Sequence, residues 1–322
     1  MSQFNFLAPV SKEMKIVESR LDKYVQSDLA MLNEAAGHLI GAGGKRLRPG
    51  FALLAAKIYQ DDLENIIPLA IALELVHMAT LVHDDVIDNS MVRRGTDTVK
   101  LAWGNRVSIY AGNFIFARAM SIIADYEDVE IIDILADTSM KICQGEIIQM
   151  LSCYNVNLGL KNYLRRIERK TALLISVSCQ LGAILAKAPE NEIKALTRYG
   201  YYLGMGFQIT DDILDFVADE QTLGKPTGSD IRQGVITLPA LYALNHSVYK
   251  DELRQLLASP EACDREADKI IEMIIDSDGI DYSYWLARHY AGKAKKQLDM
   301  IPEHPVKNTL LEITDYILER DY

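Results

Sequence analysis

The sequence contains few residues that end secondary structure: 19 glycines and 9 prolines among 322 residues. Together they form about 9% of the chain, compared with the ~12% that is usual in globular proteins. Sandwiches and barrels of short β-strands need many turns, and turns are rich in these two residue types. The composition therefore disfavours an all-β fold and favours long helices.

The chain also lacks an excess of positive charge. Its 34 lysines and arginines are outnumbered by 45 aspartates and glutamates, which gives a net charge of −11. Binding to nucleic acid depends largely on counterion release by basic side chains, so no nucleic-acid partner is expected. An acidic protein can still bind anions, but only where cations or metal ions gather locally.

Cysteines are few, and none is spaced as in a zinc site or a redox motif. Cys143, Cys153, Cys179 and Cys263 are expected to be reduced thiols of a cytoplasmic protein. No basic segment followed by an apolar core opens the sequence, so no signal peptide is expected. The weakly polar run 171–186 is short for a membrane span of ~20 residues, so no transmembrane segment is expected either.

Apolar residues recur at three- and four-residue spacing through much of the chain, a pattern typical of amphipathic helices. The alternation typical of β-strands is nearly absent. The segments with the helical pattern are 11–36, 65–90, 106–124, 128–152, 161–187 and 190–218. No linker rich in proline, serine or charge separates them. We therefore predict an all-α fold in which residues 1–322 form a single helical-bundle domain.

An acidic pattern, DDxxD, occurs twice within these apolar segments. It spans residues 84–88 and again residues 211–215, 127 positions later. In each copy the first and last aspartates stand about 40° apart on one helical face. At ~6 Å and an effective dielectric constant of ~20, two such charges repel by about 3 kcal/mol, so a cation is needed to offset them. Carboxylates without histidine or cysteine neighbours favour Mg²⁺ or Mn²⁺ over zinc. For either copy alone, a solvated acidic face is the alternative.

Two polar side chains share the faces of these aspartates. His77 lies seven residues before Asp84, and Gln208 lies three residues before Asp211. Each alignment favours a role in binding substrate. The alternative for His77 is a histidine packed in the core, and the alternative for Gln208 is an amide bonded to a neighbour within the helix.

Cations stand where an anionic ligand would need them. The segment 44–49, GKRLRP, carries three cations behind a glycine turn but lacks the residues of a P-loop. Arg93 and Arg94 follow the first acidic motif, where complementing a helix dipole is their alternative role. Lys170 and Lys225 complete the set. Two acidic motifs with dispersed cations match a site for diphosphate esters, because guanidinium groups grip phosphate oxygens and metal ions bridge phosphate to carboxylate.

Six motifs follow one another between residues 43 and 239. They are GGKRLRP at 43–49, ELVHMATLVHDDVIDNSMVRRG at 74–95, QGEIIQM at 144–150, RKT at 169–171, GMGFQITDDILDF at 204–216 and LGKPTGSDIRQGVITLP at 223–239. In this order they resemble the motifs of the trans-isoprenyl diphosphate (polyprenyl) synthase family. The likeness is nearest to the large catalytic subunit of two-component heptaprenyl and hexaprenyl diphosphate synthases. It implies an isoprenoid-synthase bundle of helices around a central active-site cavity.

The resemblance assigns the six aspartates of the acidic motifs to metal ions. Those that would ligate three Mg²⁺ ions around an allylic diphosphate are Asp84, Asp88 and Asp211. Those that would support these ligands, in part through metal-bound water, are Asp85, Asp212 and Asp215.

The resemblance also divides the other polar residues between two diphosphate groups. Those that would bind the diphosphate of isopentenyl diphosphate are Gly44, Lys45, Arg48, His77 and Arg94. Those that would hold the allylic diphosphate directly are Arg93, Lys170 and Lys225. Thr171 and Gln208 would aim oxygen dipoles at the allylic cation.

The implied reaction is a Mg²⁺-dependent condensation of isopentenyl diphosphate with an allylic diphosphate, such as farnesyl diphosphate. The product would be an all-trans polyprenyl diphosphate for quinone side chains. Before the first acidic motif, Val76, Ala79 and Thr80 are small or modest in size, which leaves room for a growing chain. Burial along such a channel favours elongation at ~0.8 kcal/mol per CH₂, and the resemblance favours roughly 30–35 carbons. Expected partners are a second copy or a small regulatory subunit, with transient membrane contact on product release.

Three other functions stay open at this stage. A short-chain geranylgeranyl diphosphate synthase would share the same motifs. A class I terpenoid cyclase needs no second diphosphate site, so segment 44–49, His77 and Arg94 count against it. A non-catalytic regulatory subunit could lose its metal ligands, whereas both acidic motifs are intact here.

Overall fold

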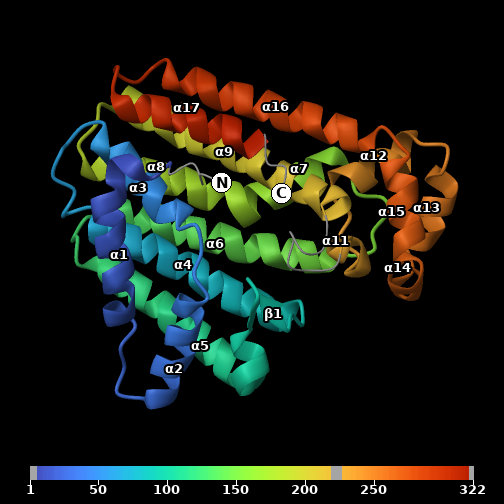
Figure 1. Ribbon diagram of the computed structural model, residues 1–322, viewed down its shortest axis with the longest axis horizontal. Coiled ribbons are helices and arrows are strands. Elements are labelled where there is room, and N and C mark those ends of the chain that lie inside the picture. Colours follow the sequence, from blue (N-terminus) through green and yellow to red (C-terminus); the bar gives the residue numbers. More distant parts are fainter. Residues whose placement is uncertain (1–5, 219–226, 319–322) are drawn as a thin grey trace. The chain divides into compact units, whose positions relative to one another are not determined.

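The computed structural model of the chain describes residues 6–218 and 227–318. Nearly all ordered structure in them is helical (Figure 1). The described strands are β1 (Val92–Arg93) and β2 (Thr96–Asp97), which form one short antiparallel hairpin. The prediction of an all-α fold is therefore confirmed. The chain divides into two compact units, which are described one at a time.

The first unit holds the described residues up to 136 together with residues 177–197 and 301–309. Its complete helices are α1 (Ser11–Tyr24), α2 (Ala30–Gly41), α3 (Leu47–Lys57), α4 (Ile67–Ile87) and α5 (Val99–Ala124), after the short 3₁₀ helix η1 (Ala8–Val10). Helix α4 is central, since it packs against α1, α3 and α5. Its residues are apolar on almost every side, and such a helix is stable only when it is buried. The first acidic motif thus follows directly from a core helix.

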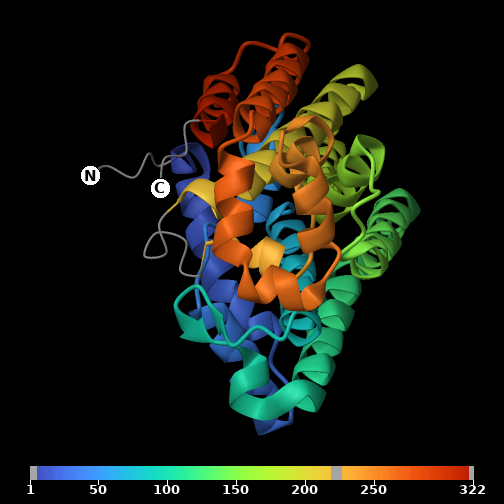
Figure 2. The same cartoon turned by 90° about the vertical axis from the view of Figure 1, so that its right-hand side faces the viewer.

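The second unit holds residues 137–176, residues 198–300 and the described residues from 310 onward. Its complete helices are α7 (Leu160–Ile167), the π-helical turn η2 (Glu168–Ala172), α11 (Ser229–Arg232), α12 (Leu238–His246), α13 (Lys250–Leu257), α14 (Pro260–Arg265), α15 (Ala267–Ile275) and α16 (Gly279–Leu298). Helices α12 to α15 lie side by side, drawn in orange in Figure 2. The core of this unit includes Tyr163, Ile209, Ile213, Leu241 and Ile270, all of them buried.

Some helices contribute residues to both units. They are α6 (Val129–Ser152), α8 (Leu173–Leu185), α9 (Glu190–Val217) and α17 (Pro305–Leu318). The second acidic motif lies on the part of α9 that belongs to the second unit. Nothing in this division tests the expected single domain of residues 1–322, which stays a prediction.

The helical pattern over residues 11–36 predicted one helix, but the structure has two, α1 and α2. The break is held by side chain and backbone together. The N–H of Ser27 donates to Oδ1 of Asn33, and the amide of Asn33 donates to the carbonyl of Ser27, both at 2.8 Å. An asparagine that bonds the backbone in this way competes with the helix, which the apolar periodicity does not register.

Two described helices, α4 and α5, are long and apolar enough to cross a membrane by length and composition alone. Of the apolar window in each, 67% is buried in α4 and 39% in α5. Core helices of folded proteins meet the same test, so the finding is weak evidence for a span. The expected absence of a transmembrane segment stays a prediction.

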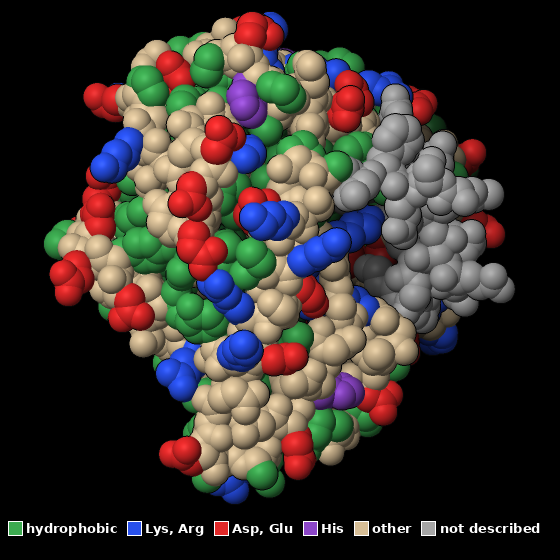
Figure 3. Space-filling view, turned by 60° about the vertical axis from the view of Figure 1, so that its left-hand side comes forward, with side chains coloured by type: hydrophobic (Ala, Val, Ile, Leu, Met, Phe, Trp, Pro, Cys, Tyr) green, Lys and Arg blue, Asp and Glu red, His purple; other side chains and the backbone are tan. Residues whose placement is uncertain are grey.

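All four cysteines are free thiols, as predicted. Burial raises the pKa of Cys179 to about 12 and that of Cys263 to about 11, so neither is a reactive thiolate at neutral pH. Lysine, arginine, aspartate and glutamate side chains are interspersed on the face in Figure 3, so the acidic net charge does not exclude local positive charge.

Candidate diphosphate and metal site

The first acidic motif lies at the end of α4. Asp84 and Asp85 lie in its last turn, and Asp88 is its C-terminal cap, whose N–H donates to the carbonyl of Asp84 at 2.7 Å. Asp84 and Asp88 are half-buried, whereas Asp85 is 2% exposed. Carboxylates at this end of a helix oppose its dipole, so cations are needed nearby. The two predicted ligands are accessible and the predicted support is buried, although the roles themselves stay predictions.

The hairpin after α4 supplies a cation for the buried aspartate. From β1, Arg93 donates through Nε to Oδ1 of Asp85 at 2.7 Å, and its Nη2 lies 2.7 Å from the same oxygen. Burial raises the pKa of Asp85, and the charge and hydrogen bond of Arg93 partly offset this effect. Arg93 was expected to hold the allylic diphosphate; in the structure its partner is Asp85.

His77 lies near the middle of α4, and the positive charges of four arginines act on it. They are Arg48, Arg94, Arg93 and Arg46. Burial lowers the pKa of His77 well below its ordinary value, and these positive charges lower it further. His77 is therefore a neutral imidazole at neutral pH, able to donate one hydrogen bond and accept another.

The glycine turn before α3 fixes where several of these cations lie. Gly43 and Gly44 have φ angles of 71° and 149°, which residues with a Cβ rarely adopt. The guanidinium of Arg94 lies against Gly44, where a Cβ would clash with it, and donates to the carbonyl of Gly43. Lys45 is exposed and Arg48 is half-buried. The residues expected to bind isopentenyl diphosphate are thus grouped in this unit.

The residues expected to set product length all lie on α4. Val76 and Ala79 are each 1% exposed, and Thr80 is half-buried. The hydroxyl of Thr80 donates to the carbonyl of His77 at 2.7 Å. All three side chains are short, but two of them are packed inside the unit, so a channel along this face stays a prediction.

The second acidic motif lies near the end of α9. Asp211 is half-buried, whereas Asp212 and Asp215 are 5% and 1% exposed. The motif thus repeats the division seen in the first one. The predicted metal ligand is accessible, and the predicted supports are buried.

A chain of hydrogen bonds connects Asp212 to Thr171. The hydroxyl of Tyr163 donates to Oδ2 of Asp212 at 2.7 Å, and the amide of Gln208 donates to Oδ1 at 2.8 Å. The hydroxyl of Thr171 donates to the amide oxygen of Gln208. Burial raises the pKa of Asp212 to about 6, although the charge of Arg166 and the two donated hydrogen bonds hold it down. Thr171 and Gln208, which were expected to act together, are therefore in direct contact.

Lys170 and Thr171 lie in the π-helical turn η2. Such turns insert an extra residue into a helix and occur frequently at functional sites. The amine of Lys170 donates to the amide oxygen of Gln149 at 3.2 Å. Helix α9 comes very close to this turn at Gly204, where a Cβ would lie 2.5 Å from the Cα of Ala172. The missing side chain lets the helix that carries the second motif lie against η2.

Asp215 accepts hydrogen bonds from residues that follow it in the chain. The hydroxyl of Ser229 donates to its Oδ1 at 2.9 Å, and the N–H of Asp230 donates to its Oδ2 at 3.0 Å. Its own carbonyl accepts the N–H of Gly228 at 2.7 Å. Asp215 therefore anchors the start of α11. Lys225, expected to hold the allylic diphosphate, lies outside the described residues.

The aspartates suit a hard divalent ion by their chemistry. Among the described residues, no three His, Cys, Asp or Glu side chains form a cluster that could hold a metal ion as they stand. Within each unit, however, the acidic motifs contain half-buried carboxylates: Asp84 and Asp88 in the first, and Asp211 in the second. Oxygen donors of this kind fit Mg²⁺, which usually takes one or two carboxylates and completes its shell with water and substrate phosphates.

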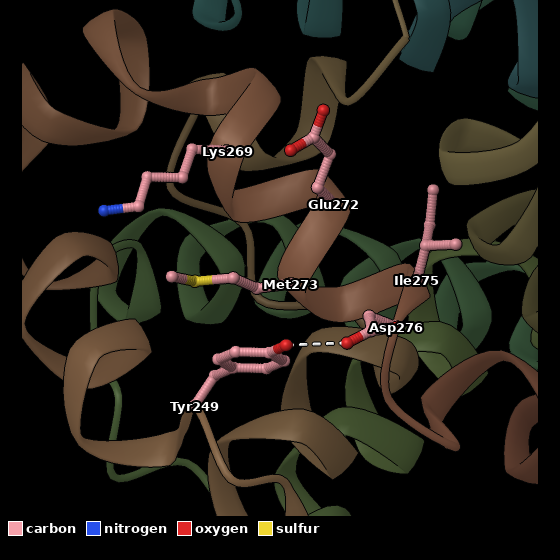
Figure 4. A pocket seen from close by; sticks show the side chains of 6 residues that line it. All are labelled: Tyr249, Lys269, Glu272, Met273, Ile275 and Asp276. Carbon is pink, nitrogen blue, oxygen red and sulfur yellow. Dashed lines mark hydrogen bonds between the residues drawn. The ribbon is translucent and has the colours of Figure 1, made fainter.

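The second unit also has a surface hollow of about 590 Å³ (Figure 4). It is lined by Tyr249, Lys269, Glu272, Met273, Ile275 and Asp276. The hydroxyl of Tyr249 donates to Oδ2 of Asp276 at 2.6 Å, so two of its polar groups satisfy each other. None of the residues predicted to act on substrate lines this hollow, and its volume alone does not make it the site.

Sequence reasoning missed the buried partners of these residues. Arg46 was counted as one of three cations, but it is 6% exposed and pairs with Glu18 and Glu74. Glu74 could have been found, because it is the one carboxylate in an apolar run. Tyr163 and Arg166 carried no such signal, since their roles depend on contacts with distant residues.

Comparison with known proteins gives one consistent result. The family model of the polyprenyl synthetases matches residues 29–274. Heptaprenyl diphosphate synthase component 2 of Geobacillus stearothermophilus is 46% identical over 321 residues, covering 100% of this chain and 99% of that protein.

Solved structures agree with this. The heptaprenyl diphosphate synthase of Staphylococcus aureus superposes with a TM-score of 0.91 at 36% identity, with 100% of both chains covered. A polyprenyl synthase of Caulobacter crescentus, complexed with calcium and isoprenyl diphosphate, also gives 0.91 at 36% identity, with 99% of this chain and 98% of that one covered. The predicted family and fold are thus confirmed.

Proposed function

Because the chain belongs to the polyprenyl synthetase family, we propose that it condenses isopentenyl diphosphate with an allylic diphosphate, with farnesyl diphosphate as the primer. The chain is a chain-elongating trans-prenyltransferase. The observation that carries the substrate proposal is the set of arginines whose charges act on a neutral His77. Of these, Arg93 pairs with Asp85 of the first acidic motif. Arg48 and Arg94 lie beside the glycine turn and suit a second diphosphate, which elongation needs and cyclisation does not.

The family uses a divalent metal ion. For this chain the proposed ion is Mg²⁺, with Mn²⁺ as a substitute, at three per active site. The carboxylates proposed to hold it are Asp84, Asp88 and Asp211, supported by Asp85, Asp212 and Asp215. When bound, it supplies positive charge that stabilises the departing diphosphate.

Side chains of the protein carry the remaining steps. The allylic carbon–oxygen bond breaks and its electron pair leaves with the diphosphate, to which Arg93, Lys170 and Lys225 donate hydrogen bonds. The double bond of isopentenyl diphosphate then attacks the allylic carbon, and loss of a proton restores a double bond in the product. Thr171 and Gln208 direct oxygen dipoles toward the allylic cation. The departed diphosphate takes the proton, so no side-chain base is required.

The other diphosphate, that of isopentenyl diphosphate, is not broken and must only be held. The residues proposed to hold it are Gly44, Lys45, Arg48, His77 and Arg94. Guanidinium groups donate paired, charge-assisted hydrogen bonds to phosphate oxygens. A neutral His77 adds a donor without a further charge.

The proposed product is a chain of roughly 30–35 carbons, the length that the family resemblance favours. Each added unit buries five more apolar carbons, which favours elongation. Val76, Ala79 and Thr80 support this length by being short at the start of the proposed channel. The name of the Geobacillus relative, a heptaprenyl diphosphate synthase component, agrees with it. The proposed use of the product is in quinone side chains.

The relative's designation as component 2 indicates a partner subunit for that protein. For this chain we extend the proposal to a homodimer or a complex with a small regulatory subunit. Helix α5 supports an interface by exposing Leu101, Ile109 and Tyr110, at 48%, 43% and 62%. Large contiguous patches of exposed apolar side chains mark sites where subunits bind, and we place the proposed interface at this helix. A cytoplasmic location, with transient membrane contact on release of the apolar product, completes the proposal.

The direct test is incubation of the purified chain with labelled isopentenyl diphosphate, farnesyl diphosphate and Mg²⁺, with and without host lysate. Labelled product extracted into organic solvent is expected, with a ladder on reversed-phase thin-layer chromatography. Product that forms only with lysate would identify the heteromer as the active species. No product under either condition, from a folded protein, would refute the proposed reaction.

A further inference from the structure

Helix α4 contains a buried carboxylate in a region where the protein is expected to bind an anion. Glu74 is 1% exposed and lies three residues before His77, among the cations expected to bind a diphosphate. Its Oε1 accepts a hydrogen bond from Nη1 of Arg46 at 3.0 Å. Its Oε2 is buried and accepts none from the described residues. A buried carboxylate is unfavourable unless it is paired, so its pairing with Arg46 accounts for its presence.

Arg46 holds the glycine turn in place. It is 6% exposed and has φ 48° and ψ 41°, a left-handed conformation that a residue with a side chain rarely adopts. Its guanidinium donates to Glu18 at 2.9 and 3.0 Å, to the carbonyl of Ile40 at 3.2 Å and to that of Gly43 at 3.4 Å. These bonds fix the backbone that carries Lys45 on one side and leads to Arg48 on the other.

The same carboxylate acts on a second cation of the cluster. The negative charge of Glu74 acts on Arg94. Like Arg46, Arg94 donates a hydrogen bond to the carbonyl of Gly43. One carbonyl of the turn is therefore bonded to two arginines, and both arginines are influenced by one buried carboxylate. Glu74 keeps like charges together before any anion is bound.

We infer that Glu74 is a positioning residue for isopentenyl diphosphate. Through Arg46 it fixes the turn that presents Lys45 and Arg48, and through its charge it holds Arg94 beside that turn. This inference rests on the proposed function, because it takes these residues to bind that substrate.

Removal of Glu74 should either strengthen or weaken binding of isopentenyl diphosphate, and the direction separates positioning from simple electrostatics. If Glu74 were merely a negative charge near an anion site, its removal would strengthen binding of isopentenyl diphosphate. If it positions the cations, its removal weakens binding although the site becomes more positive. If it only stabilises the fold, neither Michaelis constant changes selectively.

The test uses Glu74→Gln, which keeps the shape and an acceptor oxygen but removes the charge. We expect the KM for isopentenyl diphosphate to rise about tenfold, as for loss of a charged buried hydrogen bond. The KM for farnesyl diphosphate and kcat should change less than about twofold. Because Glu64 forms an exposed pair with Arg20 at 2.8 Å, Glu64→Gln is the matched control and should change neither constant.

A double variant tests the route through Arg46. If Glu74 acts mainly through that side chain, adding Glu74→Gln to Arg46→Gln should raise the KM by less than Glu74→Gln does in the wild-type chain, and the remaining rise is the effect on Arg94. If Glu74→Gln alone fails to fold, the double variant can still be measured, because it leaves neither a buried charge at position 46 nor one at position 74. An unchanged or lowered KM in Glu74→Gln, or an equal rise for both substrates, would overturn the inference.

Binding of isopentenyl diphosphate measured by calorimetry separates this inference from the proposed function. A wild-type chain that binds the diphosphate, with weaker binding in Glu74→Gln, supports positioning whether or not the assay shows turnover. A wild-type chain that does not bind it would remove the proposed substrate and the inference together. Equal binding by both proteins would remove the inference alone.

Discussion

The two acidic motifs have the same five-residue pattern but are supported in different ways. In the first, the buried middle aspartate, Asp85, is paired with a cation, Arg93, at 2.7 Å. In the second, the middle aspartate, Asp212, receives hydrogen bonds from neutral groups, the hydroxyl of Tyr163 and the amide of Gln208. Burial raises the pKa of both carboxyls. The same local sequence can therefore be stabilised by charge or by dipoles, depending on what the tertiary structure brings to it.

The last aspartates of the motifs differ as well. Asp88 caps α4 and is half-buried, whereas Asp215 is 1% exposed and bonds Ser229 and the backbone of Asp230. A carboxylate whose two oxygens are already engaged by the protein is less available to a metal ion. The comparison supports Asp88 as a ligand and Asp215 as a support, which is the division that the family resemblance implies.

The comparison predicts where single changes abolish catalysis. Asp84→Ala and Asp211→Ala should each lower kcat by at least about 10²-fold, because each removes a carboxylate proposed to stabilise developing charge through a metal ion. Both variants should stay folded, since deleting one of two like charges relieves repulsion. Steady-state kinetics and circular dichroism measure the two effects.

Asp61→Ala is the control for this pair, because that side chain is fully exposed and pairs with Lys57 among the residues that the structure describes. It should leave kcat unchanged. Near-normal turnover combined with a lowered melting temperature in Asp84→Ala or Asp211→Ala would show that these aspartates are structural.

The helix surfaces before the two motifs also differ. Five and four residues before the first motif stand Ala79 and Thr80, whereas Gly206 and Phe207 occupy those places before the second. Both places before the first motif thus hold short side chains, whereas an aromatic ring stands at the fourth place before the second. Ala79→Phe should raise a floor in the proposed channel and shorten the product to roughly 15–20 carbons, since fewer prenyl units could be buried.

Product length on reversed-phase thin-layer chromatography measures this change. Ala102→Phe is a suitable control, because Ala102 is an exposed residue of α5. The first condensation should proceed in both variants. An unchanged product ladder in Ala79→Phe would mean that the growing chain follows another path.

Removing the partner of each buried aspartate tests which contributes more to stability, the charged partner of Asp85 or a neutral donor to Asp212. Arg93→Met leaves Asp85 buried without its cation and should lower the free energy of unfolding by about 2 kcal/mol. Tyr163→Phe removes one neutral donor from Asp212 and should lower it by about 1 kcal/mol. Urea unfolding at pH 7 followed by circular dichroism measures both.

Tyr199→Phe is the control for the second variant, because that buried hydroxyl donates to the carbonyl of Leu310 and not to a carboxylate. It should lower stability by no more than about 1 kcal/mol. If Tyr163→Phe destabilised the protein more than Arg93→Met, the contrast between the motifs would be reversed.

Whether the sequence predicted a contact depends on how many positions separate its two residues along the chain. Helix α4 and the acidic motifs follow from spacings of a few residues along one helix, whereas the grouping of cations with His77 was implied only by the family resemblance. Tyr163, which donates to Asp212, lies 49 positions away from it, and Arg46, which donates to Glu74, lies 28 positions away. Helical periodicity says which side a residue faces but not which distant side chain packs against it, so these supports were missed. The break at Asn33 was missed because a side-chain bond to the backbone ended the helix.

A further prediction concerns pH and His77, which lies seven residues before the first motif. His77 has a pKa well below 6.5 in the folded chain, because of burial and the surrounding arginines. Above about pH 6.5 it is neutral in both the folded and unfolded states, so its contribution to stability is fully present there. As the pH falls below that value, the unfolded chain binds a proton that the folded chain does not. The free energy of unfolding should then fall by up to about 1.4 kcal/mol per pH unit.

His77→Gln should remove the pH dependence of stability that the imidazole contributes. The glutamine would place a neutral amide before the first motif, as Gln208 does before the second. Urea unfolding of both proteins between pH 7 and 5 measures the difference. The wild-type chain should lose stability more steeply than the variant as the pH falls, with the two slopes converging above about pH 6.5. Parallel slopes across the whole range would mean that His77 accepts a proton as readily in the folded chain as in the unfolded one, and that the arginines do not act on it as the structure indicates.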